Sequence, residues 1–320
     1  MQPLTLVSVV IPVYENAGVL PDLLDRLRDV ADRTPAVAFE FVFVDDGSGD
    51  DSFAILKERG GRDPRLRALR LSRNFGSNAA VLAGLTYARG ECVAVMTADL
   101  QDPPELIPEM IQLWRGGAEV VLAARRSRRD PLASRMFAGL FNRLFRRFVF
   151  SDFPPGGFDF VLVGRRVADL LARMAERNSY IYGQVMWAGF ERRVLYYDRG
   201  PRASGSSRWT LAKKLKYFID AFTAFSYLPV RAASLLGVLL AVAGFGYAAV
   251  VVVWHFAGRI KEPGFAALMV ALLIVSGVQL VVIGVMGEYL WRVLEESRRR
   301  PAFVVDQTLN VEQPIVARAD

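Results

Sequence analysis

The segment Phe39–Ser48, FEFVFVDDGS, joins an apolar run rich in β-forming residues to an acidic turn, and similar joins recur over residues 1–122. Between the apolar runs lie segments whose apolar residues have helical spacing. In chain order, the runs and helical segments are 7–13, 18–32, 39–44, 52–59, 66–71, 77–88, 92–96, 104–114 and 119–123. Buried strands that alternate with helices predict an α/β fold with a mostly parallel sheet covered on both faces.

Polar residues follow four of these strands, at 12–16, 45–48, 72–74 and 97–102. In parallel sheets, ligands bind beyond the carboxyl ends of the strands. Three of the four ends are acidic. Carboxylates at that density need a cation, and hard oxygen ligands favour Mg²⁺ or Mn²⁺ shared with a diphosphate. The alternative is that Asp-Gly-Ser is only a turn and Asp-x-x-Pro-Pro only a helix start.

Several common catalytic arrangements are excluded by composition. Cysteine and histidine each occur once, as Cys92 and His255. A single cysteine excludes a disulfide framework within the chain and a Cys-based zinc site. A single histidine excludes Ser-His-Asp catalysis, Cys-His catalysis and a histidine cluster for metal. Phosphate loops of the type G-x-x-x-x-G-K-[ST] are absent. Any metal must therefore be held by oxygen ligands.

Two long runs, 232–258 and 263–287, contain no Asp, Glu, Lys or Arg. Each exceeds the ~20 residues that span a bilayer core as a helix. The runs exclude a purely soluble protein, a disordered one and a multi-span transporter. Arg231 precedes the first run, and Arg292 and Arg298–Arg300 follow the second. The positive-inside rule therefore predicts an integral membrane protein whose termini and catalytic domain are cytoplasmic.

Two basic clusters, within residues 125–150 and 192–216, contribute to a net charge of +7. In the first, arginines interleave with large apolar residues, which is typical of an amphipathic helix in a membrane interface. A further amphipathic stretch covers residues 211–228. A solvated basic face is the alternative. We favour anionic lipid or an anionic substrate as the partner, and no nucleic acid is needed to explain the charge.

The motifs together resemble family 2 glycosyltransferases of the GT-A fold, in the polyprenyl-phosphate group that includes dolichol-phosphate mannose synthase. The resemblance runs from about Ser8 through Arg300. It implies a Rossmann-like sheet, amphipathic interface helices and two C-terminal transmembrane helices. The implied domains are a catalytic domain over 1–210, juxtamembrane helices over 211–231, a transmembrane hairpin over 232–290 and a cytoplasmic tail over 291–320. We expect the tail to be irregular.

The strand ends carry the resemblance. Residues 12–16, PVYEN, resemble Pro-x-Tyr-Asn-Glu with the last two types exchanged, and Val44–Ser48 matches Val-Asp-Asp-Gly-Ser. In this second motif Asp46 would meet the ribose or the base. Asp99 and Gln101 match the Asp-x-Asp-x-Gln run that holds the metal and diphosphate in the family, whereas Thr97 replaces its first acid. The resemblance therefore implies that Asp99 and Gln101 are metal ligands.

A second acidic feature is Asp159, inside the apolar segment Gly156–Val161, GGFDFV. This segment resembles Gly-Asp-Phe-Arg of the family, with Val161 in place of the arginine. The resemblance implies that Asp159 is catalytic, either as the general base or as a residue that orients the acceptor. A carboxylate within an apolar run is costly to bury, which by itself indicates a functional role or a structural one. The alternative to a catalytic Asp159 is therefore a structural residue whose carboxylate accepts hydrogen bonds.

Basic residues of the family pattern are also present. Residues 199–208, RGPRASGSSR, resemble Arg-x-x-Arg-x-x-Gly-x-Ser-Lys, and Arg125 resembles the arginine after the fifth strand. The residues implied for nucleotide-sugar binding are Pro12, Tyr14, Glu15, Asn16, Val44, Asp46, Thr97, Ala98, Asp99, Arg125, Arg202 and Arg208. Those implied for the acceptor phosphate and lipid are Arg135, Arg143, Arg146 and Arg199.

The resemblance implies inverting transfer of a sugar from a UDP- or GDP-sugar to an undecaprenyl or dolichyl phosphate, with Mg²⁺ or Mn²⁺ as cofactor. It also implies that the chain can form homo-oligomers. Two alternatives stay open. A processive family 2 synthase is one, although its Gln-x-x-Arg-Trp motif is absent. A non-catalytic membrane protein that binds nucleotide-sugars is the other, and it stays open because Thr97 and Val161 depart from the family pattern.

Overall fold

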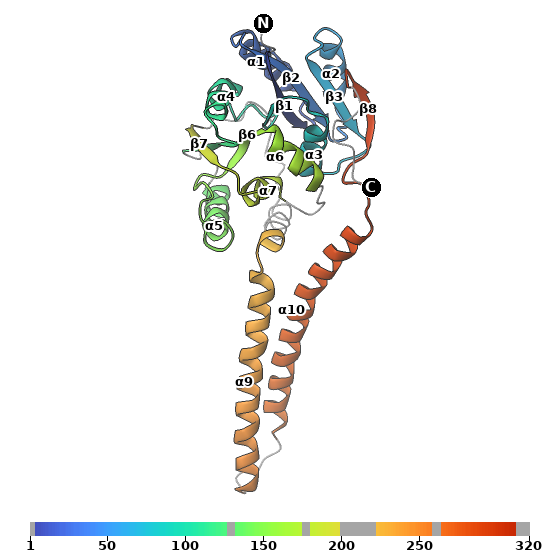
Figure 1. Cartoon of the computed structure of the whole chain (residues 1–320). Coiled ribbons are helices and arrows are strands. Elements are labelled where there is room, and N and C mark those ends of the chain that lie inside the picture. The colour runs from blue at the N-terminus through green and yellow to red at the C-terminus, as the bar shows by residue number, and fades with distance from the viewer. Residues whose placement is uncertain (1–3, 127–131, 175–179, 199–221, 258–263, 312–320) are drawn as a thin grey trace. The chain divides into compact units, whose positions relative to one another are not determined.

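The computed structural model describes residues 4–126, 132–174, 180–198, 222–257 and 264–311 (Figure 1). The chain divides into two compact units. One unit consists of Met1–Ala221 together with Pro301–Asp320, and the other of Phe222–Arg300. The membrane-type helices are therefore an insertion within the unit that carries the sheet.

An eight-stranded mixed sheet forms the first unit, in the order β7-β5-β6-β4-β1-β2-β3-β8. The strands are β1 Thr5–Val13, β2 Val37–Asp45, β3 Leu66–Leu71, β4 Cys92–Val95, β5 Val120–Arg125, β6 Phe158–Gly164, β7 Arg192–Tyr197 and β8 Val305–Leu309. Strands β1 to β4 pair parallel, as do β5 and β7. Strand β6 runs antiparallel between β4 and β5. The predicted α/β fold with a mostly parallel sheet is confirmed.

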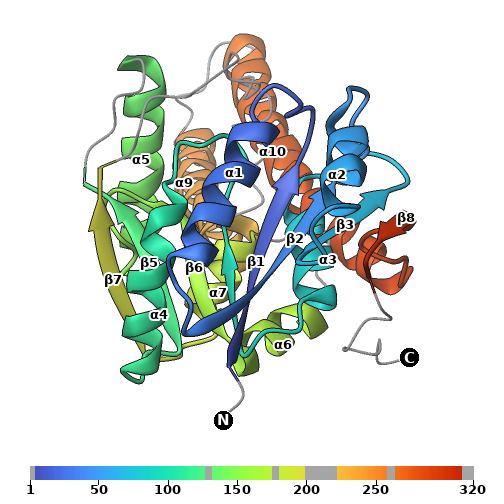
Figure 2. The same ribbon diagram turned by 90° about the horizontal axis from the view of Figure 1, so that it is seen from above.

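Helices cover both faces of this sheet (Figure 2). They are α1 Leu20–Asp32, α2 Ser52–Gly60, α3 Ser77–Tyr87, η1 Pro104–Leu106, α4 Ile107–Arg115, α5 Leu132–Phe148, α6 Arg165–Met174 and α7 Ile181–Trp187. Val9 and Ile11 of β1 join α1, α2 and α4 in one hydrophobic core. Val10 points the other way, since a Cβ on Gly84 of α3 would lie 2.2 Å from its Cγ1. Both faces of β1 are thus buried, which explains its continuous apolar run.

The tail contains an ordered edge strand. β8 pairs antiparallel with β3, and the Ser72 N–H donates to Val304 O at 2.9 Å beyond the end of β3. The Asn310 side chain donates to Gly60 O at 2.8 Å and to Leu66 O at 2.9 Å. The prediction of an irregular tail was wrong for residues 305–309, because an edge strand can be held by backbone pairing without a long apolar run.

The second unit contains two long helices, α9 Leu228–Phe256 and α10 Phe265–Ser297, which contact each other. The spans Leu228–Trp254 and Ile274–Ser297 are long and apolar enough to cross a membrane, and neither is buried inside the structure. The two predicted apolar helices are therefore present. Residues 211–221 of the predicted amphipathic stretch lie outside the described residues.

Candidate active site

The loops at the carboxyl ends of β1 and β2 are joined by hydrogen bonds. The backbone N–H of Glu15 donates to Ser48 Oγ at 2.8 Å, and that of Asn16 to Ser52 Oγ at 2.9 Å. The Ala17 N–H donates to Asp50 Oδ2 at 3.1 Å. The structure thus brings together the two motifs predicted to bind the nucleotide. Pro12 is the last residue but one of β1, Tyr14 is exposed and Val44 is buried in β2.

Asp46 lies buried where these loops meet the start of α3. Its Oδ1 accepts the N–H of Phe75 at 2.7 Å, and its Oδ2 accepts that of Gly76 at 2.9 Å. Burial raises the pKa of Asp46 to about 6, against the lowering effect of these two hydrogen bonds. Asp46 therefore fixes the loop before α3. Each carboxylate oxygen keeps a second lone pair, so the predicted contact with a ribose or base stays a prediction.

Positive φ angles at non-glycine residues mark two of the predicted loops. Glu15 has φ of 52° in the nucleotide motif, and Leu100 has φ of 58° between Asp99 and Gln101. Such conformations are sparsely populated and persist where the surroundings impose them, often at functional sites. Both residues lie next to residues that the sequence predicts to bind the donor.

The loop after β4 has oxygen ligands of the kind expected for a hard cation. Asp99 Oδ1 accepts the Thr97 hydroxyl at 2.9 Å and the Gln101 N–H at 3.2 Å. Thr97 Oγ1 also lies 3.1 Å from Asp102 Oδ2. Within the described residues no group of three or more acidic, His or Cys side chains could hold a metal by itself. A divalent cation held by one carboxylate plus substrate phosphates fits this loop, in which Ala98 is buried.

Arg125, the last residue of β5, forms an ion pair with Asp159 through Nη2 and Oδ2. Ala123 pairs with Phe160 and Ala124 with Phe158, so Asp159 is the extra residue of a β-bulge. The backbone at Gly156 lies against the backbone of Arg125, and only glycine fits there, since a Cβ would lie 1.9 Å from Arg125 O. Arg125, predicted to bind the nucleotide-sugar, and Asp159, predicted as the general base or the residue that orients the acceptor, are thus in direct contact.

The Arg125 guanidinium is almost completely buried, with 3% of its side chain exposed, against 34% for Asp159. Burial lowers the pKa of Arg125, but the carboxylates of Asp159 and Asp102 outweigh it and raise the pKa overall. The Tyr182 hydroxyl donates to Asp159 O at 2.9 Å. Arg125 is therefore charged, and β6 is fixed at Asp159 from two sides.

Asp102 and Tyr197 are a second buried pair beside Arg125. The Tyr197 hydroxyl donates to Asp102 Oδ1. Burial and the charge of Asp102 raise the pKa of Tyr197, so the phenol keeps its proton. Sequence reasoning assigned no role to Asp102, Tyr197 or Tyr182. Asp102 lies in one of the predicted acidic strand ends, so its position in the sequence could have indicated a role at the site. Tyr197 lies 95 residues further along the chain, and no local pattern connects it to Asp102.

Helix α5 carries the first basic cluster. Arg143 and Arg146 are exposed, while Phe145 is buried edge-on to Phe153 and Tyr180, with ring centroids 5.1 and 6.0 Å apart. The pattern predicts a helix that lies in a membrane interface. The described part of α5 packs Phe145 into the sheet unit, where Phe153 in turn contacts Phe158 of β6, and contact of its exposed side with a membrane stays a prediction. The Arg135 side chain, Arg199, Arg202 and Arg208 lie outside the described residues.

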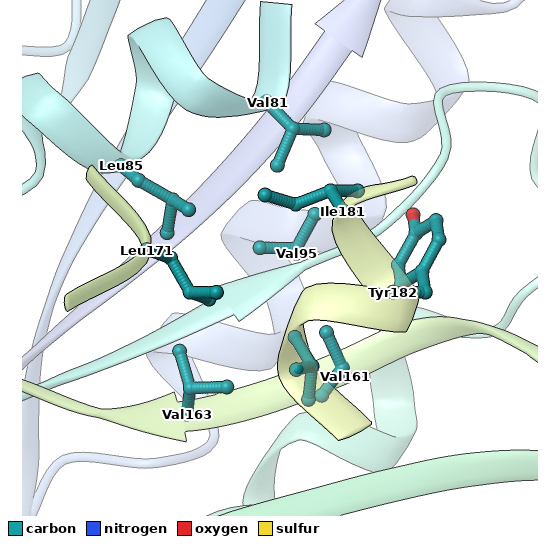
Figure 3. A pocket seen from close by; sticks show the side chains of 9 residues that line it. Val81, Leu85, Val95, Val161, Val163, Leu171, Ile181 and Tyr182 are labelled. Atoms are coloured by element: carbon teal, nitrogen blue, oxygen red, sulfur yellow. The ribbon is translucent and has the colours of Figure 1, made fainter. Parts of the chain in front are cut away.

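A small apolar pocket lies on the α3, α6 and α7 side of the sheet (Figure 3). Its lining residues are Val81, Leu85, Val95, Val161, Val163, Leu171, Ile181, Tyr182 and Val185. Val161, the residue that replaces the arginine of the family motif, faces this pocket. The lining offers no charged group to a phosphate, so the pocket belongs to the packing behind β6.

Comparisons with known proteins agree with these features. The family model described as Glycosyl transferase family 2 matches residues 8–159. The chain is 38% identical over 306 residues to the uncharacterized glycosyltransferase YkcC of Bacillus subtilis (strain 168), which covers 95% of this chain and 94% of that protein. It is 33% identical over 300 residues to the bactoprenol glucosyl transferase of Shigella phage SfV, with 93% and 97% covered.

A solved structure resembles the fold. Mannosyl-3-phosphoglycerate synthase from Rubrobacter xylanophilus superposes with a TM-score of 0.50 and 18% sequence identity. The likeness covers 82% of this chain and 78% of that one. At this identity it concerns the fold alone.

Proposed function

The chain belongs to glycosyl transferase family 2, and from this premise we propose that it transfers one sugar from a nucleotide-sugar to a polyprenyl phosphate. The chain is a glycosyltransferase, and the predicted GT-A fold is confirmed. The non-catalytic alternative is therefore set aside.

The observation that carries the proposal is the full-length similarity to a bactoprenol glucosyl transferase. It extends over 93% of this chain and 97% of that protein, more than the sheet unit alone can account for. The two membrane-type helices suit an acceptor that resides in a bilayer. A processive synthase has no comparable support, since two spans are too few for a polymer channel.

In the proposed reaction, a phosphate oxygen of the acceptor attacks the anomeric carbon from the side opposite the diphosphate. The new C–O bond forms as the bond to the nucleoside diphosphate breaks, so the configuration inverts. A phosphate monoester has a second pKa of ~6 and is largely ionised at pH 7. Asp159 accordingly orients the acceptor or removes its remaining proton, and Arg125 offsets the repulsion between this carboxylate and the phosphate.

Positive charge at the leaving diphosphate would come from several sources. Arg202 and Arg208 are proposed to contact it. Mg²⁺ or Mn²⁺ held by Asp99 and Gln101 would offset the charge that develops there. Asp46, Glu15 and the loop around them are proposed to hold the nucleoside.

The proposed location follows from the charges around α9 and α10. Arg231, Arg292 and Arg298–Arg300 flank the two spans, and the positive-inside rule puts such residues in the cytoplasm. The sugar would then be transferred at the cytoplasmic face of the membrane. The exposed arginines of α5 are proposed to contact the acceptor phosphate or the lipid headgroups.

A donor screen tests the proposal. The purified full-length protein is incubated with UDP- and GDP-sugars, a short polyprenyl phosphate and Mg²⁺ or Mn²⁺, and the products are analysed by mass spectrometry. We expect a lipid that carries one sugar. A sugar polymer would support the processive alternative, and the absence of any sugar-lipid product with every donor would refute the proposal.

A further inference from the structure

A polar network, buried at Asp102, Tyr197 and Arg125, joins the loop after β4 to the bulge of β6. It contains side chains from the loop, from β7, from β5 and from β6. Its members are Thr97, Asp102, Tyr197, Arg125 and Asp159. Two of these, Asp102 and Tyr197, have no part in the proposed reaction, although Asp102 is completely buried and Tyr197 is 5% exposed.

Both oxygens of Asp102 have partners within the network. The Tyr197 hydroxyl donates to Oδ1, and the Thr97 hydroxyl lies 3.1 Å from Oδ2. A buried carboxylate is costly unless it is hydrogen-bonded or paired with a positive charge. Asp102 meets both conditions, because Arg125 lies close enough for the Asp102 carboxylate to act on its charge. The position of Asp102 is thus fixed.

Arg125 is bound less completely than Asp102. Its Nη2 donates to Asp159, whereas its buried Nε has no hydrogen-bond partner in the part of the chain that the structure describes. Arg125 is the register partner of Tyr197 in the parallel pair of β5 and β7, so their side chains lie side by side on one face of the sheet, and the Tyr197 phenol is bound to Asp102. The direction in which Arg125 points therefore depends on Asp102 and Tyr197.

Thr97 connects the network to the predicted metal loop. Its hydroxyl lies 2.9 Å from Asp99 Oδ1 and 3.1 Å from Asp102 Oδ2. A hydroxyl has a single proton to donate, so one side chain is shared between the two carboxylates. Asp99 Oδ1 also accepts the Gln101 N–H at 3.2 Å, so Asp99 keeps a partner of its own when Asp102 is changed.

We propose that Asp102 and Tyr197 are positioning residues that hold Arg125, and through it Asp159, in place relative to the loop that binds the diphosphate. This proposal rests on the proposed function. The hydroxyl of Tyr197 touches neither substrate in this account. It acts through Asp102 and Arg125.

The expected signature is a loss of turnover without a loss of donor affinity. Most of the residues predicted to bind the donor, Asp46 and Glu15 among them, lie in loops outside the network. The chemical step depends on the alignment of Arg125 and Asp159. Removing a hydrogen bond to a buried charged group should reduce kcat by roughly 10- to 100-fold. The KM for the nucleotide-sugar should stay within about threefold, because ground-state contacts are unchanged.

The test compares Tyr197→Phe with Tyr196→Phe in the full-length protein. Tyr196 is the neighbouring residue of β7 and is 47% exposed, so its side chain lies on the other face of the strand. Circular dichroism and the melting temperature show whether each variant is folded. Lipid-linked sugar formation at several donor concentrations then gives kcat and KM.

A second variant, Asp102→Asn, keeps the shape of the side chain and covers the case in which Tyr197→Phe does not fold. It should lower kcat in the same range. The double variant Tyr197→Phe/Asp102→Asn should be no slower than Asp102→Asn alone, because the two residues act through one hydrogen bond.

The proposal is overturned if Tyr197→Phe matches Tyr196→Phe in kcat, or if donor KM rises while kcat is unchanged. Fully additive losses in the double variant also contradict it. A wild-type protein that forms no lipid-linked sugar refutes the proposed function, and that result is distinct from an active wild type whose variants show no split between kcat and KM.

Discussion

Gly156 offers a direct test of the geometry at the β6 bulge. A Cβ at this position would lie 1.9 Å from Arg125 O, whereas real Cβ atoms essentially never approach another heavy atom closer than 3.0 Å. In Gly156→Ala the backbone must therefore move by at least 1.1 Å (3.0 − 1.9). Asp159 follows three residues later, as the second residue of β6, so the displacement reaches the ion pair with Arg125.

The size of the expected effect follows from that displacement. A misplacement of about 1 Å at a reacting centre can cost on the order of 100-fold in rate. We accordingly expect Gly156→Ala to lower kcat for sugar transfer by roughly 100-fold. Donor binding should change little, because Asp46 directly follows β2 and its partners lie in the loop before α3.

The assay measures lipid-linked sugar formation for wild type, Gly156→Ala and Gly139→Ala. Gly139 is an exposed residue of α5 where a Cβ meets nothing within 4 Å. Gly139→Ala should retain wild-type kcat and gain up to ~1 kcal/mol of stability from the better helix propensity of alanine. If Gly156→Ala is as active as Gly139→Ala, the bulge does not set the position of Asp159 and the reasoning fails.

Three further changes test individual residues. Asp159→Asn should leave donor binding intact while turnover drops by orders of magnitude, and near-normal turnover would exclude a catalytic role. Asp99→Ala should abolish the binding of nucleoside diphosphate that depends on Mg²⁺ or Mn²⁺, as measured by calorimetry, and unchanged affinity would refute the metal assignment. For Asp46, burial raises the pKa from 3.8 to about 6, so its stabilising contribution is present below pH 3.8 and is lost as the pH rises to about 6. At ~1.36 kcal/mol per pKa unit, the difference in free energy of unfolding between wild type and Asp46→Asn should change by ~3 kcal/mol over that window. A difference that does not vary with pH would contradict a buried Asp46 with a raised pKa.

The parallel part of the sheet was predictable because it is buried on both faces. The run 66–71 coincides with β3, and residues 7–13 lie within β1. Such strands need apolar side chains at most positions, which gives a nearly continuous signal, interrupted by Ser8 in β1 and by Arg67 and Arg70 in β3. The acidic strand ends were predictable for the same reason, since parallel topology brings their carboxyl ends to one edge.

Other parts depend on contacts that no local pattern reveals. The apolar run at Phe158–Gly164 is visible in the sequence, but its antiparallel direction depends on the long connection through α5. The exposed strand β8, VDQTL, has little apolar content and is defined by its pairing with β3. The hydrogen bond between Tyr197 and Asp102 joins residues 95 positions apart and exists only in the folded sheet.

The position of β8 at the end of the chain also bears on how the protein is synthesised. β3 is complete at Leu71, whereas β8 begins at Val305, 234 positions later (305 − 71). At about 5–20 residues per second, a ribosome needs roughly 10 to 50 s to cover that length. During this interval the outer edge of β3 lacks its final partner, and unpaired edges are templates for aggregation. Completion of the catalytic unit therefore waits until both long helices have been made, and a fragment that ends at Ala221 keeps the edge open permanently.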